Sequence, residues 1–166
     1  MRDVQLRVHV PGGDPAAAYD QIGAFARYPE LVDVVRSVIV HDAVPGRPLA
    51  SDWEVYFRNG LLRWSEVDTF DDERRRIVFE QTTGDFQVFR GVWRVEPADG
   101  GCDVCFDAEF DFGIPSLAGI LDPIAAKVLK ETIALVIAGL LGDVSVVGDE
   151  GVAASVTAKL ALAKAS

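Results

Sequence analysis

The sequence predicts an α+β fold in which a curved antiparallel sheet of seven strands surrounds one long helix near the C-terminal end. Two observations predict this arrangement. Short runs of alternating apolar and polar residues, separated by turn residues, follow one another along most of the 166-residue chain. A long apolar stretch over residues 114–141 comes after the last run. A meander of that length curls, and this stretch is the only expected helix large and apolar enough to fill its concave side.

The strands are predicted from runs that alternate in polarity and end at turn signals. Pro11 and two glycines end the first run, and the sequences VPGRP, NG, GD and PADGG separate later ones. The strands are expected over residues 4–10, 34–42, 53–58, 61–67, 76–83, 86–96 and 102–112. The order is therefore one strand, two helices, six strands and the long helix.

The helices are predicted from their caps and from apolar content. Asp14 can accept a hydrogen bond at the start of a helix whose first residue is a proline, and this helix is expected to run to about Arg27. The sequence YPELV then begins a short second helix. The long helix is expected to start at about Ser116 or Asp122 and to end at Leu141, where a glycine follows.

The composition argues against several classes of partner. The chain has 26 acidic and 16 basic residues and a formal charge of −10, which argues against nucleic acid and anionic membrane surfaces. Prolines and charged residues interrupt the most apolar stretch, so no stable membrane insertion is expected. With no signal peptide visible, we expect a cytoplasmic protein. Cys102 and Cys105 enter a strand and the two histidines lack ligand spacing, so neither a metal site nor a cofactor is expected.

The hairpin WEVYFRNGLLRWSEV places one acid on an apolar face. Its NG turn predicts a two-residue connection, which pairs Trp53 with Glu66. Since successive side chains of a strand alternate in direction, Glu66 then shares a face with Trp53, Val55, Phe57, Leu62 and Trp64. Ser51 and Asp68 also face inward, but near the strand ends, where we expect solvent to reach them. A charge buried on this face is costly unless it is paired or solvated.

The two later turns, GD and PADGG, put a second charged residue, Arg90, on the same face. Three explanations stay open. Glu66 and Arg90 could form a structural ion pair across the sheet, they could be polar groups in a ligand cavity, or the register could be wrong at one of them. A bulge near Gly91 would break this register and turn Trp93 inward.

The segment GDFQVFRGVWRVEPADGGCDVCFDAEFDFGIP resembles the signature of the START / Bet v 1-like superfamily, in its polyketide cyclase/dehydrase and coenzyme Q-binding branch. The resemblance covers about residues 4–141, and FARYPELVDVVRSVIV is similar to the two-helix entry into the second strand. It implies a helix-grip fold with an internal hydrophobic cavity. Residues 1–142 would form the ligand-binding domain, and residues 143–166 a loosely attached extension.

The resemblance implies a cyclase or aromatase that binds a hydrophobic polycarbonyl or aromatic molecule and promotes aldol cyclisation and dehydration. Glu66 and Arg90 would be the catalytic residues. The ligand would be bound by Trp53, Val55, Trp64, Phe79, Gln81, Phe86, Val88, Phe106, Phe110 and Thr132.

Two further functions stay open. One is non-catalytic binding, in which the protein carries or sequesters a quinone, a lipid or an aromatic natural product. The other is a chaperone-like role in a larger complex. The expected partner is a hydrophobic small molecule, and a cyclase would also meet an acyl carrier protein. The protein itself would be a monomer or a homodimer.

Overall fold

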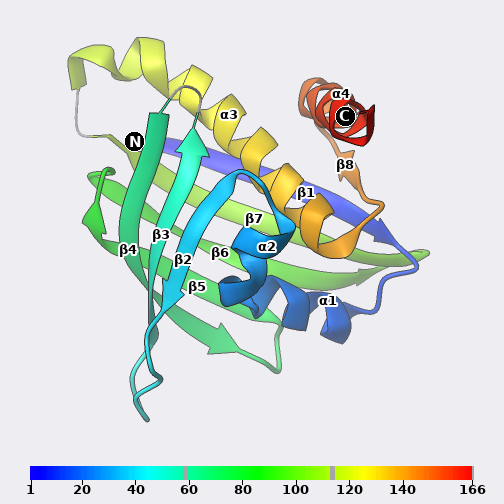
Figure 1. Cartoon of the computed structure of the whole chain (residues 1–166), viewed down its shortest axis with the longest axis horizontal. Helices are drawn as coiled ribbons and strands as arrows, with labels where there is room; N and C mark the ends of the chain where they lie inside the picture. Colours follow the sequence, from blue (N-terminus) through cyan, green and yellow to red (C-terminus); the bar gives the residue numbers. More distant parts are fainter. Residues whose placement is uncertain (58–59, 113–114, 166) are drawn as a thin grey trace.

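The computed structural model describes residues 1–57, 60–112 and 115–165, with the side chains of 115–122 and 163–165 left out. These described residues form one antiparallel sheet of eight strands in the order β2-β3-β4-β5-β6-β7-β1-β8. The strands are β1 (Arg2–Pro11), β2 (Val35–Val40), β3 (Leu49–Phe57), β4 (Gly60–Asp71), β5 (Arg76–Gly84), β6 (Val88–Ala98), β7 (Gly101–Asp111) and β8 (Ser145–Val147). The sheet curves around the long helix α3 (Pro115–Leu141), as Figure 1 shows, which confirms the predicted helix-grip fold.

Two short helices connect β1 to β2. The first, α1 (Pro15–Gly23), begins at the predicted cap, where the Asp14 carboxylate accepts a hydrogen bond from the Ala17 amide. A 3-10 turn (Phe25–Arg27) and α2 (Tyr28–Leu31) follow, so the single helix predicted up to Arg27 is divided at Ala24. Helix α1 packs against β6, β7 and α3, while α2 packs against β2 and α3.

The segment after residue 142 supplies an eighth strand, where the sequence predicted seven. Strand β8 pairs with β1, and helix α4 (Glu150–Ala165) packs against α3 (Figure 1). Val152 and Val156 are buried in this contact, and Lys159 donates a hydrogen bond to Glu131. The domain boundary at residue 142 stays a prediction. Among the described residues, none of the helices combines the length and hydropathy needed to cross a bilayer.

The β3–β4 hairpin has a register that differs from the predicted one by two residues. Trp53 pairs with Trp64 and Ser51 pairs with Glu66, whereas the turn predicted that Trp53 pairs with Glu66. The predicted turn residues lie partly outside the described residues. Because side-chain direction repeats every two residues, this shift leaves each side chain on its predicted face. Glu66 therefore lies on the buried face, as alternation required.

Strand β6 is displaced by one residue from its predicted register, and this reverses its two faces. Trp93 pairs with Phe106 of β7, and Gly91 lies between Phe79 of β5 and the neighbouring strand. The predicted inward positions of Arg90 and Val88 are therefore wrong, since the odd-numbered residues of β6 face inward.

The connection into β6 explains the displacement. It is longer than the predicted two-residue turn, and the Gln81 amide holds it by hydrogen bonds to the backbone N–H and C=O of Phe86. The observed register buries Phe89 and Trp93 and leaves Arg90 in water, which is favourable for both kinds of side chain. A side chain at Gly91 would bring its Cβ within 2.4 Å of the Asp107 carbonyl oxygen, so only glycine fits this close approach.

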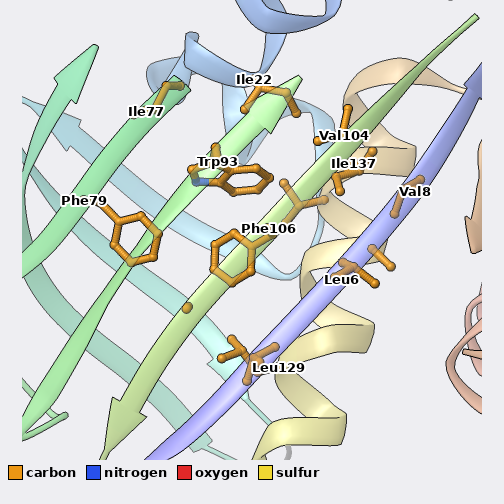
Figure 2. Close-up of a cluster of buried hydrophobic side chains, with 14 of the residues drawn as sticks. Leu6, Val8, Ile22, Ile77, Phe79, Trp93, Val104, Phe106, Leu129 and Ile137 are labelled. Atoms are coloured by element: carbon orange, nitrogen blue, oxygen red, sulfur yellow. The ribbon is translucent and has the colours of Figure 1, made fainter. Parts of the chain in front are cut away.

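The core lies between the concave face of the sheet and α3. Figure 2 shows Phe79, Trp93 and Phe106 projecting from three neighbouring strands on the side of the sheet that α3 covers. Ile137 of α3 is fully buried in the same cluster, and Leu129 is nearly so.

Candidate ligand cavity

A cavity of about 50 Å³ lies within this core. Eight of the predicted site residues line it: Trp53, Val55, Trp64, Glu66, Phe79, Phe86, Phe106 and Thr132. Sequence reasoning missed Phe89 and the apolar residues of α3, and it placed Trp93 inward only in the alternative register with a bulge near Gly91. A small-molecule pocket usually measures about 300–1,000 Å³, so a ring-sized ligand requires wall side chains to move. Phe57, Leu62, Trp64 and Ile133 line the cavity and are only partly buried, so they are the wall residues that can move toward solvent.

Aromatic rings form most of the wall. The indoles of Trp53 and Trp64 are parallel, with their ring centroids 5.9 Å apart. Trp64 forms edge-to-face contacts with Phe86 and Phe89, and Trp53 forms one with Tyr28. Parallel and edge-to-face arrangements are the favourable ones for aromatic pairs, so the wall is both apolar and well packed.

The polar part of the cavity is a chain of hydrogen bonds between β3 and β4. Trp53 Nε1 donates to Ser51 Oγ at 2.9 Å, and Ser51 Oγ donates to Asp68 Oδ2 at 2.7 Å. Trp64 Nε1 donates to Glu66 Oε1 at 2.7 Å. Glu66 is 6% exposed, Asp68 1% and Ser51 0%, so the prediction that solvent reaches Ser51 and Asp68 is wrong. The overlying helices bury these strand ends, which strand alternation could not indicate.

Neither of the two carboxyl groups has a cationic partner among the described residues, so the pair is most stable when it holds a proton. Burial raises the pKa of Glu66 well above its usual range, and the neighbouring Asp68 raises it further. Burial also raises the pKa of Asp68, while hydrogen bonds from Glu66 and Ser51 lower it. Protons of such a pair belong to both groups and cannot be assigned to one of them alone. The pKa of Tyr28 is raised as well, first by burial and then by these two acids.

The other predicted site residues lie away from the cavity. Arg90 is on the outer face, where its side chain is 52% exposed and its Nη2 lies 2.9 Å from Glu109 Oε2. The expected pairing of Arg90 with Glu66 is therefore wrong, and so is a direct role for Arg90 at the cavity. Gln81 supports the β5–β6 connection, and Phe110 packs behind Phe86.

Metal binding has no support in the part of the chain that the structure describes. There, histidine, cysteine, aspartate and glutamate side chains do not gather in groups of three or more that could hold an ion. Cys102 and Cys105 are buried free thiols, and burial raises the pKa of both.

Comparison with known proteins shows which family shares this architecture. The family model described as polyketide cyclase / dehydrase and lipid transport matches residues 12–136. The solved structure of the TTHA0849 protein of Thermus thermophilus is 24% identical, with a TM-score of 0.74, and the match covers 84% of this chain and 94% of that one. No curated protein matches the chain.

Two further structures have the same fold. The Zhui aromatase/cyclase of Streptomyces sp. R1128 is 16% identical, with a TM-score of 0.65, over 85% of this chain and 93% of that one. A START superfamily protein of Mycobacterium smegmatis is 15% identical, with a TM-score of 0.64, over 83% and 94%. The family model covers most of the chain, and the chain therefore belongs to the polyketide cyclase / dehydrase and lipid transport family.

Proposed function

We propose that this protein binds a compact hydrophobic molecule in the cavity between its sheet and α3. One observation carries the proposal: the cavity wall is almost wholly aromatic and aliphatic, and among the described residues only one carboxyl group, that of Glu66, faces it. Apolar walls with few polar groups are typical of small-molecule sites. The family description includes lipid transport, which agrees with a role in binding.

Binding is better supported than catalysis. The family resemblance implies an arginine that polarises substrate carbonyls, but none of the described residues that line the cavity is an arginine or a lysine. The cavity is also far smaller than a folded polyketide chain. A carrier or sequestering protein needs neither feature.

A second candidate is the cyclisation and dehydration of a polycarbonyl. The Glu66–Asp68 pair supports it, because two coupled carboxyl groups with different pKa values can serve as acid and base. Aromatase/cyclases are among the structures with this fold. Under this candidate an acyl carrier protein would deliver the substrate. A cytoplasmic location and a monomeric or homodimeric state remain part of either proposal.

Intrinsic fluorescence tests the proposal directly, because all three tryptophans of the chain line the cavity. Titration with 1,4-naphthoquinone should quench the emission saturably, with a dissociation constant on the order of micromolar, or about −8 kcal/mol. Thr132→Phe fills the cavity and should abolish the saturable phase. Val78→Phe adds the same ring to an exposed position of β5 and should leave it unchanged. Quenching that never saturates, or that is the same in all three proteins, contradicts the proposal.

A further inference from the structure

We propose that the ligand of this cavity carries a hydrogen-bond donor, a hydroxyl or ammonium group on an apolar ring, and that Glu66 accepts it. This inference rests on the proposed function, since it requires the cavity to take up a ligand. It concerns the polar group of the ligand, whereas the proposed function concerns the apolar body.

The donors around the cavity are almost all used within the protein. The Thr132 hydroxyl donates to the Val128 carbonyl at 2.8 Å, and the Tyr28 hydroxyl donates to the Ile22 carbonyl. The indole N–H groups of Trp53 and Trp64 donate to Ser51 and to Glu66. A ligand carbonyl would therefore find none of these donors free, and an unsatisfied polar atom in a dry cavity costs free energy.

One wall donor is an exception. The indole N–H of Trp93 has no acceptor among the residues that the structure describes. An indole N–H is a neutral donor, and its bond to a neutral carbonyl is weaker than a bond to a charged carboxyl pair.

The proton of the carboxyl pair is also committed inside the protein. Asp68 Oδ1 is buried and receives no hydrogen bond from the other described side chains or backbone amides. A carboxyl proton on Glu66 would satisfy it, and Glu66 Oε1 already accepts from Trp64. With its proton directed to Asp68, Glu66 presents only oxygen lone pairs to the cavity.

The charge of the pair favours the same kind of ligand. With one proton shared, Glu66 and Asp68 carry one negative charge, and the described lysines and arginines make no ion pair with either. The other titratable group against them is Tyr28 of α2, which stays neutral and uses its hydroxyl hydrogen elsewhere. A donated hydrogen bond, or an ammonium charge, would stabilise this charge. The surrounding indoles would add cation–π attraction for an ammonium group.

Four probes with one ring system separate the alternatives by calorimetric titration. They are 2-naphthol, 2-naphthylmethylamine, 2-methoxynaphthalene and 2-acetylnaphthalene. The two donor probes should bind at least about tenfold more tightly than 2-methoxynaphthalene, whereas 2-acetylnaphthalene should not. The neutral and the cationic donor distinguish a hydroxyl ligand from an amine.

Variants assign the preference to Glu66. In Glu66→Met the advantage of the donor probes should fall to within about twofold, because the acceptor is gone. Retained binding of 2-methoxynaphthalene shows that this variant keeps its cavity. Arg90→Met makes a matched charged-to-methionine change on the outer face and should keep the full preference. If Glu66→Met does not fold, the comparison of the four probes in the unmodified protein still decides whether a hydrogen-bond donor on the ligand is preferred.

Two results would overturn the inference while leaving the proposed function intact. Equal affinity for all four probes would show that the polar group is not recognised. Tighter binding of 2-acetylnaphthalene would show that an acceptor is preferred, and its loss in Trp93→Phe would assign that preference to the free indole N–H. If none of the probes binds, both the proposed function and this inference fail.

Discussion

Two glutamates of one hairpin, Glu54 and Glu66, have opposite surroundings. Glu54 lies on the outer face of β3, where hydrogen bonds from Arg63 and Ser37 lower its pKa. Glu66 lies on the inner face of β4, where burial raises its pKa and an indole is its hydrogen-bond donor. One sheet therefore keeps its acids ionised on one face and holds a proton on the other.

The two faces as a whole repeat this difference. On the outer face, carboxylates pair with arginines of neighbouring strands, as in Arg94–Asp107 at 2.7 Å. Such pairs add little stability, because water already solvates both charges. On the inner face, an additional arginine would cost desolvation and occupy the ligand's volume. A shared proton leaves the pair with one negative charge and leaves the cavity free. The predictions below test this contrast, from the largest expected effect to the smallest.

The inner face should be the more sensitive to loss of a side chain. Trp53→Ala removes a buried indole that contacts Tyr28 and Trp64, and should lower the free energy of unfolding by about 3–5 kcal/mol. Tyr56→Ala truncates an exposed ring of the same strand and should cost about 0.5 kcal/mol or less. Urea denaturation measures both. Similar losses for the two variants would contradict the contrast.

Removal of a serine hydroxyl should lower stability on the inner face of the sheet and have little effect on the outer face. Ser51→Ala leaves the Trp53 indole N–H without an acceptor and Asp68 Oδ2 without its donor, at a cost of about 1–3 kcal/mol. Ser37→Ala removes an outer-face hydroxyl that donates to Glu54, and water can replace that bond. Its cost should stay within about 0.5 kcal/mol. Thermal melting at one pH compares the two variants. Equal losses of stability would show that the inner-face hydrogen bonds contribute no more than the outer-face one.

The two glutamates should respond to pH with opposite sign. The native pKa of Glu66 lies above its unfolded value of about 4.5, so the native state binds more protons and stability falls as pH rises from there toward the native pKa. Glu66→Gln should remove most of this fall. The pKa of Glu54 is lowered, so its contribution is present above about pH 4.5 and is lost in acid. Glu54→Gln should therefore flatten only the acid side.

Urea denaturation midpoints measured from pH 3 to pH 9 give the change of stability with pH for the unmodified protein and for both variants. Asp68 and Tyr28 also titrate with raised pKa values, so Glu66→Gln should reduce the slope without abolishing it. If stability rises with pH in the unmodified protein above pH 5, Glu66 does not hold a proton in the folded state.

The smallest effect on stability is expected for substitution of Arg90, the residue that the sequence predicted to interact with Glu66. Arg90→Met removes an exposed ion pair with Glu109 and should change stability by about 0.5 kcal/mol or less. Since Arg90 and Glu66 lie on opposite faces, a double-mutant cycle with Glu66→Gln should give a coupling energy within about 0.5 kcal/mol of zero. A coupling above about 1 kcal/mol would restore the ion pair predicted from the sequence.

Much of the cavity follows from patterns that the sequence displays. Alternation put Trp53, Trp64 and Glu66 on one face, and an error of two residues in the hairpin register did not change this. The Asp14 cap and the long apolar helix were also predicted, because their determinants lie within a few residues of one another. The resemblance to a known family supplied the helix-grip arrangement of these elements.

Strand β6 shows where sequence reasoning fails. Its error was a single residue in the connection after Gly84, and an odd shift sends every side chain of the strand to the other face. Only the tertiary structure shows that the Gln81 amide holds the backbone of Phe86, whose ring lies in the core. It also shows that Gly91 lies in contact with Asp107 and Ala108 of β7. The contact of Gly91 with β7 joins segments distant in sequence, so local patterns left both registers open and could not decide whether Trp93 or Arg90 faces inward.

The sequence by itself determined that an acid lies on the buried face of the β3–β4 hairpin, since the period of two is a local property of a strand. The tertiary structure decided what that acid does. Burial depends on the helices that cover the strand ends, and the partners of Glu66 depend on which side chains the curved sheet brings beside it. That arrangement placed Asp68 and Ser51 in the dry interior and Arg90 in water, so that the neighbour of Glu66 is a second acid and not the predicted arginine.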